Sequence, residues 1–308
     1  MSESIDALQL NLDSGGLLVM NISLAIIMFG VALELTVDDF KKVAKNPKGT
    51  ILGLCSQFLL LPALTYLLVI FMKPHPSFAL GMMMVAACPG GNISNFFSLL
   101  ARGNAALSVS MTAFATLLCI FMTPFNFAFW ASLYEPTNAI LTQIHLDLFE
   151  VFRIIVLILG IPLLLGMTLR HFKDELSKLM SPYIKNFGIL FFAGFVIVAF
   201  SMNFENFMNY VHLVIVLVFF HNTIALMSGY GLGHLFGLPR KDKKSIAIET
   251  GIQNSGLGLL LIFNFFDGLG GMALVAAWWG IWHIVAGLSI GWYWSIGKST
   301  LQRVFTNA

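Results

Sequence analysis

The chain has 308 residues, enough for two soluble domains, but its composition excludes a soluble class. It is 58% hydrophobic and only 10% charged, whereas about a quarter of the residues of soluble domains are charged. The net charge of +2 comes without the clustered basic residues that bind nucleic acid, so we expect no nucleic-acid partner. Many separate apolar runs of ~20 residues instead predict an all-α membrane protein in a lipid bilayer.

The cysteines and the first residues exclude two further features. Cys55, Cys88 and Cys119 all lie in apolar runs, so they predict neither a disulfide framework nor a metal site. Residues 1–13 contain acids but no Lys or Arg. A signal peptide needs a basic start, so we expect no cleavable signal.

About nine spans are predicted in chain order, with boundaries accurate to a few residues. The predicted spans are 17–35, 50–72, 78–101, 105–133, 148–169, 184–202, 211–236, 246–266 and 272–296. A polar segment, 134–147, separates the fourth span from the fifth. Together these spans predict a single polytopic membrane domain over residues 1–308.

The basic residues support this count. With nine spans the loops alternate between two sides, and all of the 17 Lys and Arg residues except Lys73 and Arg153 fall on one side. The positive-inside rule assigns that side to the cytoplasm. We therefore expect a multi-pass protein of the cell (inner) membrane, with its N-terminus outside and its C-terminus in the cytoplasm.

The third span is interrupted by the sequence CPGGNISN at positions 88–95. Proline removes a helical hydrogen-bond donor, and paired glycines favour non-helical backbone. Irregular backbone at membrane depth is tolerated only inside protein or beside a water-filled cavity. Proline and glycine can also merely kink a membrane helix, but the adjacent Asn92, Ser94 and Asn95 favour a functional break.

The eighth span contains a carboxylate, Glu249, followed by the polar run 253–255 between Gly251 and Gly256. A charge at the bilayer centre costs at least ~3 kcal/mol, so it usually marks an ion or substrate path. The alternative is that Glu249 only braces neighbouring helices through local hydrogen bonds.

The two interrupted spans are five apart, so they run in opposite directions through the membrane. This arrangement is typical of an inverted-repeat secondary transporter whose site lies where the broken helices meet. A repeat of five plus five spans needs ten, so the first repeat here lacks its first helix.

Further polar residues in the apolar spans fit an ion site. Ser108 and Thr112 are four apart and share a helical face, and Gln57 lies in an otherwise apolar run. Singly, each is more often a helix–helix contact than a ligand. As a set with Glu249, they offer oxygen ligands and one carboxylate, which suit a hard monovalent cation. His221 and His283 fit packed, hydrogen-bonded residues better than proton relays.

At these residues the sequence resembles the bile acid:sodium symporter family. The resemblance covers most of the chain from about residue 23 to residue 291. It rests on five motifs, at positions 27–30, 88–95, 101–108, 221–222 and 249–256.

The resemblance implies two sodium ions and an organic-anion substrate. One sodium site would use Ser94, Asn95, Ser108, Thr112 and Glu249. The other would use Gln57, Glu249 and Gln253 with the backbone carbonyls of Thr250 and Ile252. The substrate would meet Asn92, the amide of Ile93, Asn254 and His283. It would bind between a panel domain (spans 17–35, 148–169 and 184–202) and a core domain (50–133 and 211–296) that holds the crossing.

Two departures from the family bear on the substrate. The chain lacks the extra N-terminal helix of many bacterial members, and Ile284 stands where some relatives have asparagine after the histidine. Ile284 makes the pocket slightly more apolar, which is compatible with an amphipathic carboxylate such as a bile acid.

The function predicted from the sequence is sodium-coupled import of such an anion by alternating access. The alternative is a sodium- or proton-coupled carrier of a small carboxylate such as pantoate or pyruvate. A channel and a non-transporting sensor stay open. We predict no enzyme, because no His-Glu-x-x-His motif is present and no span carries an evident pair of nucleophile and base. We also predict no obligate protein partner.

Overall fold

The computed structural model describes residues 14–36, 41, 47–144, 148–202 and 204–296. Within these ranges every regular element is a helix, and the one extended pairing is an antiparallel bridge between Gly90 and Gln253. The expectation of no signal peptide concerns residues 1–13, which lie outside the described residues.

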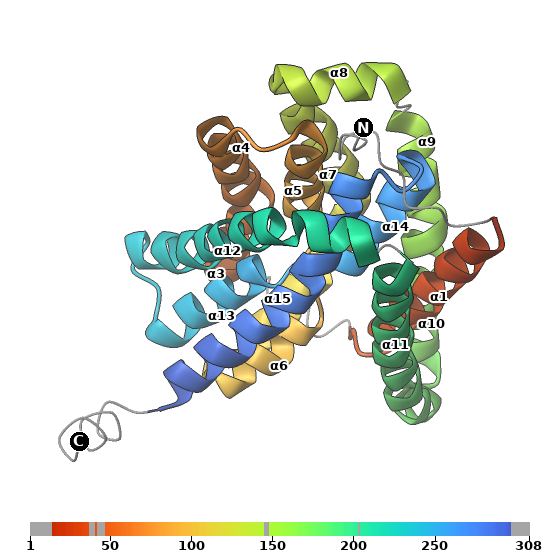
Figure 1. Cartoon of the computed structure of the whole chain (residues 1–308). Helices are drawn as coiled ribbons and strands as arrows, with labels where there is room; N and C mark the ends of the chain where they lie inside the picture. Colours follow the sequence, from red (N-terminus) through yellow and green to blue (C-terminus); the bar gives the residue numbers. More distant parts are fainter. Residues whose placement is uncertain (1–13, 37–40, 42–46, 145–147, 203, 297–308) are drawn as a thin grey trace, which may run out of the picture.

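The helices of the described residues run through the molecule as shown in Figure 1. They are α1 (Ser14–Ala32), α3 (Pro47–Cys55), η1 (Ser56–Leu60), α4 (Leu61–Met72), α5 (Pro76–Ala87), α6 (Ile93–Leu100), α7 (Ala105–Leu133), α8 (Glu135–Ile144), α9 (Leu148–Ile155), η2 (Val156–Gly160), α10 (Ile161–Phe172), α11 (Asp174–Met202), α12 (Phe204–Leu235), α13 (Arg240–Gly251), α14 (Ser255–Phe265) and α15 (Gly270–Ser295).

Six uninterrupted helical stretches of the described chain are long and apolar enough to cross a membrane. They are Gly15–Ala32, Pro47–Met72, Ala105–Leu133, Phe149–Phe172, Met208–Leu235 and Gly270–Ser295. They match the first, second, fourth, fifth, seventh and ninth predicted spans. The third and eighth are each divided into two short helices, as predicted. The sixth lies within α11, so the full count of nine and the orientation stay predictions.

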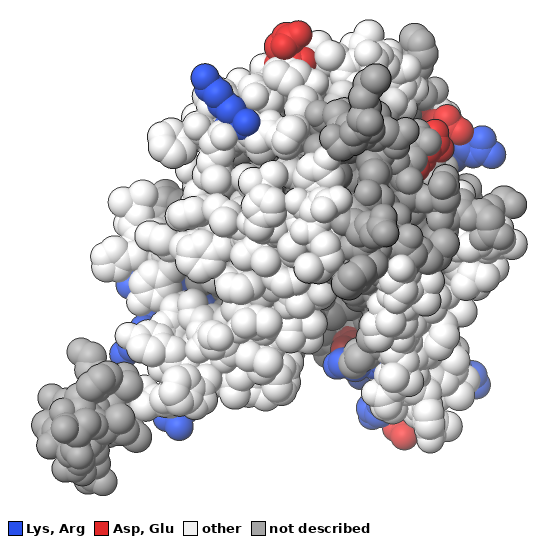
Figure 2. All heavy atoms as spheres, in the orientation of Figure 1, with Lys and Arg blue, Asp and Glu red and all other residues white. Residues whose placement is uncertain are grey.

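The surface shown in Figure 2 has the character of a bilayer-embedded protein. Charged side chains gather at its two ends, and a broad uncharged band lies between them. Large apolar side chains are exposed in this protein, including Phe71 at 86% and Leu164 at 63%. Exposed apolar side chains of this size are stable where they face lipid rather than water.

Two helical segments extend beyond what hydropathy predicts. The polar segment after α7 contains α8, whose start is held by Thr137 donating to the carbonyl of Ala131 at 2.6 Å. Helix α11 begins at Asp174, ten residues before the predicted span, with Asp174 ion-paired to Lys178 at 2.6 Å. The hydrogen bond from Lys178 also lowers the pKa of Asp174. Hydropathy does not predict polar helix ends of this kind, because they contain no apolar run.

Two membrane helices contain one turn of π-helix each. The turn η1 precedes Pro62, and the turn η2 precedes Pro162. Proline has no N–H, so it cannot donate to the carbonyl four residues earlier, and the helix widens there. The widened turn η1 contains Gln57 and holds its side chain in the interior.

Most helix contacts fall into two sets, which are joined by contacts of α1 with α14 and of α7 with α9. Helix α1 contacts α10 and α11, whereas α12 contacts α13, and α15 contacts α5, α6 and α14. Figure 1 shows α1, α10 and α11 together on the right of the molecule. This grouping is in keeping with the predicted panel and core, but the division into domains stays a prediction.

Candidate ion and substrate site

The two helix breaks face each other and satisfy each other's backbone. Helix α5 ends at Ala87 and α6 begins at Ile93, while α13 ends at Gly251 and α14 begins at Ser255. Across the gap, the N–H of Gly91 donates to the carbonyl of Ile252 at 2.7 Å. The N–H of Asn254 donates to the carbonyl of Pro89 at 2.8 Å. Backbone groups freed by the breaks are thus paired inside the protein, as membrane depth requires.

Glycine is needed where the breaks cross because other atoms approach too closely for a side chain. A Cβ added to Gly90 would lie 2.6 Å from Oε1 of Glu249 and 3.1 Å from Nε2 of Gln57. At Gly91 it would lie 3.2 Å from the carbonyl oxygen of Gln253. The paired glycines therefore let the first break lie directly against the carboxylate.

Glu249 is fully buried and accepts hydrogen bonds from three hydroxyl groups. Its Oε2 accepts from Ser94 at 2.5 Å and from Ser108 at 3.0 Å, and its Oε1 accepts from Thr112 at 2.7 Å. Thr112 also lies 3.3 Å from Oδ1 of Asn95. The residues predicted for the first ion site are thus brought together from α6, α7 and α13.

The residues predicted for the second ion site include buried amides without hydrogen-bond partners. Gln57 is fully buried, and neither its Oε1 nor its Nε2 has a partner among the described residues. The same holds for Oε1 of Gln253, whose Nε2 donates to the carbonyl of Thr250 at 2.7 Å. Unpaired buried polar groups each cost about 1–3 kcal/mol. Their presence beside a carboxylate fits a ligand that supplies the missing interactions.

The backbone carbonyls of this set can also contribute. Those of Thr250 and Ile252 each accept one hydrogen bond, from Gln253 and Gly91 respectively. A carbonyl oxygen has two lone pairs, so each keeps the capacity to meet a cation. The side chain of Thr250 is held by a hydrogen bond to Ser56 at 3.0 Å. The donor set fits a monovalent cation.

A substitution separates stability from ion binding at this point. We expect Gln57→Leu, which has a similar shape without polar atoms, to raise the free energy of unfolding in sodium-free buffer by about 1–3 kcal/mol. The same variant should lose the stabilisation that sodium gives the parent protein. Thermal unfolding with sodium or choline chloride measures both. A destabilised Gln57→Leu protein in sodium-free buffer would contradict this account.

The predicted substrate residues fall into two environments. Asn92 and Asn254 are half-buried at the crossing, and Ile93 is 37% exposed. The side chain of Asn254 caps α14 by accepting from the N–H of Leu257 at 3.0 Å. His283, in contrast, is 7% exposed on the face of α15 that packs inward. Its role as a substrate contact stays a prediction.

Two neighbouring residues, which form one motif of the family resemblance, support the crossing. Asn222 is buried in α12 and donates to the carbonyl of Gly251 at 2.7 Å, which satisfies the end of α13. His221 lies 2.7 Å from the hydroxyl of Thr65 and packs edge-on against Trp279. His221 is thus packed and hydrogen-bonded, as expected, whereas the bond from Asn222 to the end of α13 was not predicted.

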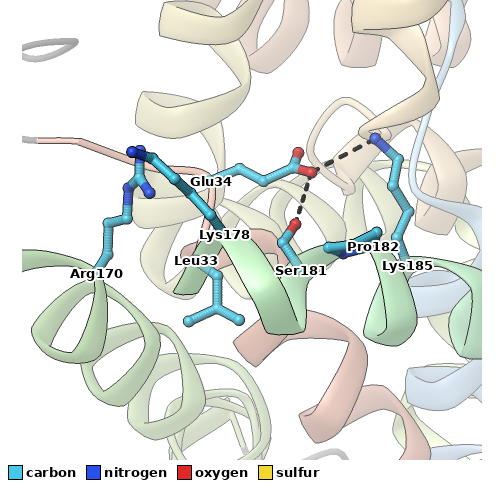
Figure 3. Close-up of a pocket in the computed structure, with 7 residues that line it drawn as sticks. All are labelled: Leu33, Glu34, Arg170, Lys178, Ser181, Pro182 and Lys185. Atoms are coloured by element: carbon cyan, nitrogen blue, oxygen red, sulfur yellow. Dashed lines mark hydrogen bonds and ion pairs between the residues drawn. The ribbon is translucent and has the colours of Figure 1, made fainter. Parts of the chain in front are cut away.

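A surface cavity of about 420 Å³ lies away from the crossing, at the ends of α1 and α10 and the start of α11 (Figure 3). In it, Glu34 accepts from Ser181 at 2.9 Å and pairs with Lys185 at 3.6 Å. None of its lining residues belongs to either predicted ion set. The buried cluster around Glu249, not this cavity, is therefore the candidate functional site.

Apolar membrane helices, two of them broken and crossed at a buried carboxylate, define the class of secondary transporters. Comparison with known families gives the particular one. Residues 21–210 match the model of the sodium bile acid symporter family, and the chain belongs to that family. This family consists of sodium-dependent membrane transporters rather than enzymes.

Similar proteins come from bacteria, plants and animals. The chain is 32% identical over 277 residues to an uncharacterized sodium-dependent transporter, YocS, of Bacillus subtilis, covering 89% of this chain and 82% of that protein. It is 29% identical to a probable chloroplastic sodium/metabolite cotransporter, BASS1, of Arabidopsis thaliana (80% and 59% covered). It is 30% identical to human sodium/bile acid cotransporter 4 (75% and 52% covered). The chain thus spans little more than half of these plant and human relatives.

Proposed function

We propose that this protein is a sodium-coupled symporter that imports an organic anion by alternating access. The observation that carries the proposal is the buried cluster at the crossing. There, Glu249 lies against the first break, and it is flanked by the side-chain amide of Gln57 and Oε1 of Gln253, which have no partner among the described residues. The oxygen ligands suit a monovalent cation, and because the chain belongs to a sodium-dependent family we infer that this cation is sodium.

Two sodium ions would share Glu249. The hydroxyl side, formed by Ser94, Ser108 and Thr112, would hold one, and the side of Gln57 and Gln253 would hold the other. Each ion would draw ligands from both broken helices or from a helix packed on them. Binding would therefore order the crossing, and the affinities for sodium and substrate would be coupled reciprocally.

The substrate proposal follows from the exposed part of the crossing. Helix α6 begins at Ile93, beside Asn92, and its positive amino end favours an anionic group. Two sodium ions with one monoanion would carry one net positive charge inward. A membrane potential of 100 mV would then contribute ~2.3 kcal/mol to uptake. This energetics fits a protein of the cell (inner) membrane.

The class of anion has two candidates. An amphipathic carboxylate such as a bile acid is favoured by Ile284, which is 39% exposed one residue after His283. A small carboxylate such as pantoate or pyruvate is the second candidate, because one similar plant protein is described as a sodium/metabolite cotransporter.

Thermal unfolding of the purified protein tests the proposal. We expect sodium, but not potassium or choline, to raise the unfolding temperature. A bile salt, pantoate or a keto acid should raise it further only when sodium is present, by the equivalent of about 2.7 kcal/mol at a hundred times its Kd. Uptake into vesicles under imposed sodium or pH gradients then separates the couplings. Uptake driven by the pH gradient alone would show that transport is coupled to protons rather than to sodium.

A further inference from the structure

A pair of amide side chains joins helix α1 to helix α14, although 243 positions separate them in the sequence. Nδ2 of Asn21 donates to Oδ1 of Asn264 at 3.2 Å, and Nδ2 of Asn264 donates to Oδ1 of Asn21 at 2.9 Å. Asn264 also donates to the carbonyl of Leu260, one turn earlier, at 2.8 Å. Both amide hydrogens of Asn264 are therefore used, and its side chain is held in the orientation that meets Asn21.

The surroundings of this amide pair are apolar. Met20, Leu24 and Leu260 are at most 7% exposed and belong to one buried cluster that includes residues of α1 and α14. Ile27 and Leu259 line the same contact. Two amides separated in such surroundings would need water to replace their partner. Amides in such a place are satisfied when they pair with each other, as here, or when they face water.

The pair lies on one defined side of the crossing. Asn264 follows Asn254 by ten helical positions, which places it ~15 Å from the crossing along α14. Helix α13 ends at the crossing, so its start lies away from the crossing and from α14. That start carries basic residues, among them Arg240 and Lys241. Helix α1 likewise ends near Glu34, beside Lys185, about a dozen residues after Asn21. The amide pair is therefore remote from the basic end, which the predicted orientation places in the cytoplasm.

We propose that Asn21 and Asn264 form the outer gate of the transport cycle. They are positioning residues: closed, they hold α1 against α14 and shut the site off from the outside, and they separate when the site opens outward. The inference rests on the proposed transport by alternating access. Because α14 begins at the crossing, rearrangement there on ion binding is passed directly to Asn264.

The size of the expected effect follows from hydrogen bonds measured between membrane helices. Losing one hydrogen-bonded pair of side chains, here the reciprocal pair of Asn21 and Asn264, shifts a conformational equilibrium roughly three- to twenty-fold. Asn264→Leu and Asn21→Leu keep the side-chain size while removing the amides, so each should shift the protein toward the outward-open state by about that factor. The double variant should shift it no further than either single one, since each change already breaks the pair.

A cysteine placed beside the gate reports its opening. In a Cys55→Ala background, Leu24→Cys is labelled from outside intact cells with a membrane-impermeant maleimide. Each labelling rate is corrected with the same protein lacking Leu24→Cys. We expect Asn21→Leu and Asn264→Leu to raise the rate roughly three- to twenty-fold. Asn138→Leu, an exposed position on α8, is the matched control and should leave the rate unchanged.

Three outcomes would contradict the proposal that Asn21 and Asn264 form the outer gate. They are equal labelling of parent and gate variants, an equal rise in Asn138→Leu, and labelling that increases only when the reagent reaches the cytoplasmic side. The assay needs neither sodium nor substrate. If the gate variants were labelled faster but the protein showed no sodium-dependent uptake, the opening between α1 and α14 would be supported and the proposed sodium-coupled transport would be contradicted.

A second measurement covers the case in which the leucine variants do not fold. Asn21→Cys with Asn264→Cys, joined by a short bifunctional thiol reagent and released by reductant, should stop substrate uptake reversibly. The same reagent should leave each single cysteine variant active. Undiminished uptake by the cross-linked protein would overturn the gate.

Discussion

Glu249→Gln is expected to remove sodium-dependent uptake while leaving a folded protein in the membrane. The carboxylate is fully buried and is common to both proposed ion sites, so its charge is the main attraction for either cation. At 4 Å and an effective dielectric constant of 20, one such charge pair is worth about 4 kcal/mol. Sodium affinity should therefore fall roughly a hundredfold or more, measured as the sodium concentration that gives half of the maximal thermal shift.

Glutamine is chosen because its amide oxygen still accepts hydrogen bonds from one side of the hydroxyl cluster. Ser94 and Ser108 meet one carboxylate oxygen, and Thr112 meets the other. Glu135→Gln, at the exposed start of α8, removes the same charge elsewhere and should change neither uptake nor the sodium response. A Glu249→Gln protein that retains the sodium response of the parent would show that this carboxylate only braces the helices.

The positions of the breaks were predictable because local chemistry fixes them. Pro89 and the glycines after it cannot continue a membrane helix, and the polar run after Gly251 interrupts the second span. The spacing also predicted that Ser108 and Thr112 share a helical face. Both hydroxyls meet the carboxylate of Glu249, and their role as ion ligands stays a prediction.

The contacts that depend on long-range packing could not be predicted from the residues alone. The antiparallel pairing of Gly90 with Gln253 joins segments far apart in the chain, and no local pattern encodes it. The same holds for the hydrogen bond from Asn222 to the end of α13 and for the paired amides of Asn21 and Asn264. Asn21, Asn222 and Asn264 lie in apolar helices, and only the folded arrangement identifies the partner of each.

Gly90→Ala is expected to damage both the crossing and the ion site with the addition of a single methyl group. That methyl carbon would lie 2.6 Å from Oε1 of Glu249 and 3.1 Å from Nε2 of Gln57, so the first break must move away from the second. Overpacking of this kind costs about 1–3 kcal/mol.

The two consequences of Gly90→Ala are measured separately, as unfolding temperature without sodium and as the further rise on adding sodium. Both should fall, because the displaced break also carries Gly91, whose N–H pairs with the carbonyl of Ile252. Gly231→Ala is the matched control: it lies in α12 with no atom within 4 Å of an added Cβ. In a helix interior that change stabilises by roughly 0.5–1 kcal/mol, so the two alanines should shift stability in opposite directions. If Gly90→Ala instead matched Gly231→Ala in both measurements, the close approach of the first break to Glu249 would have no part in binding sodium.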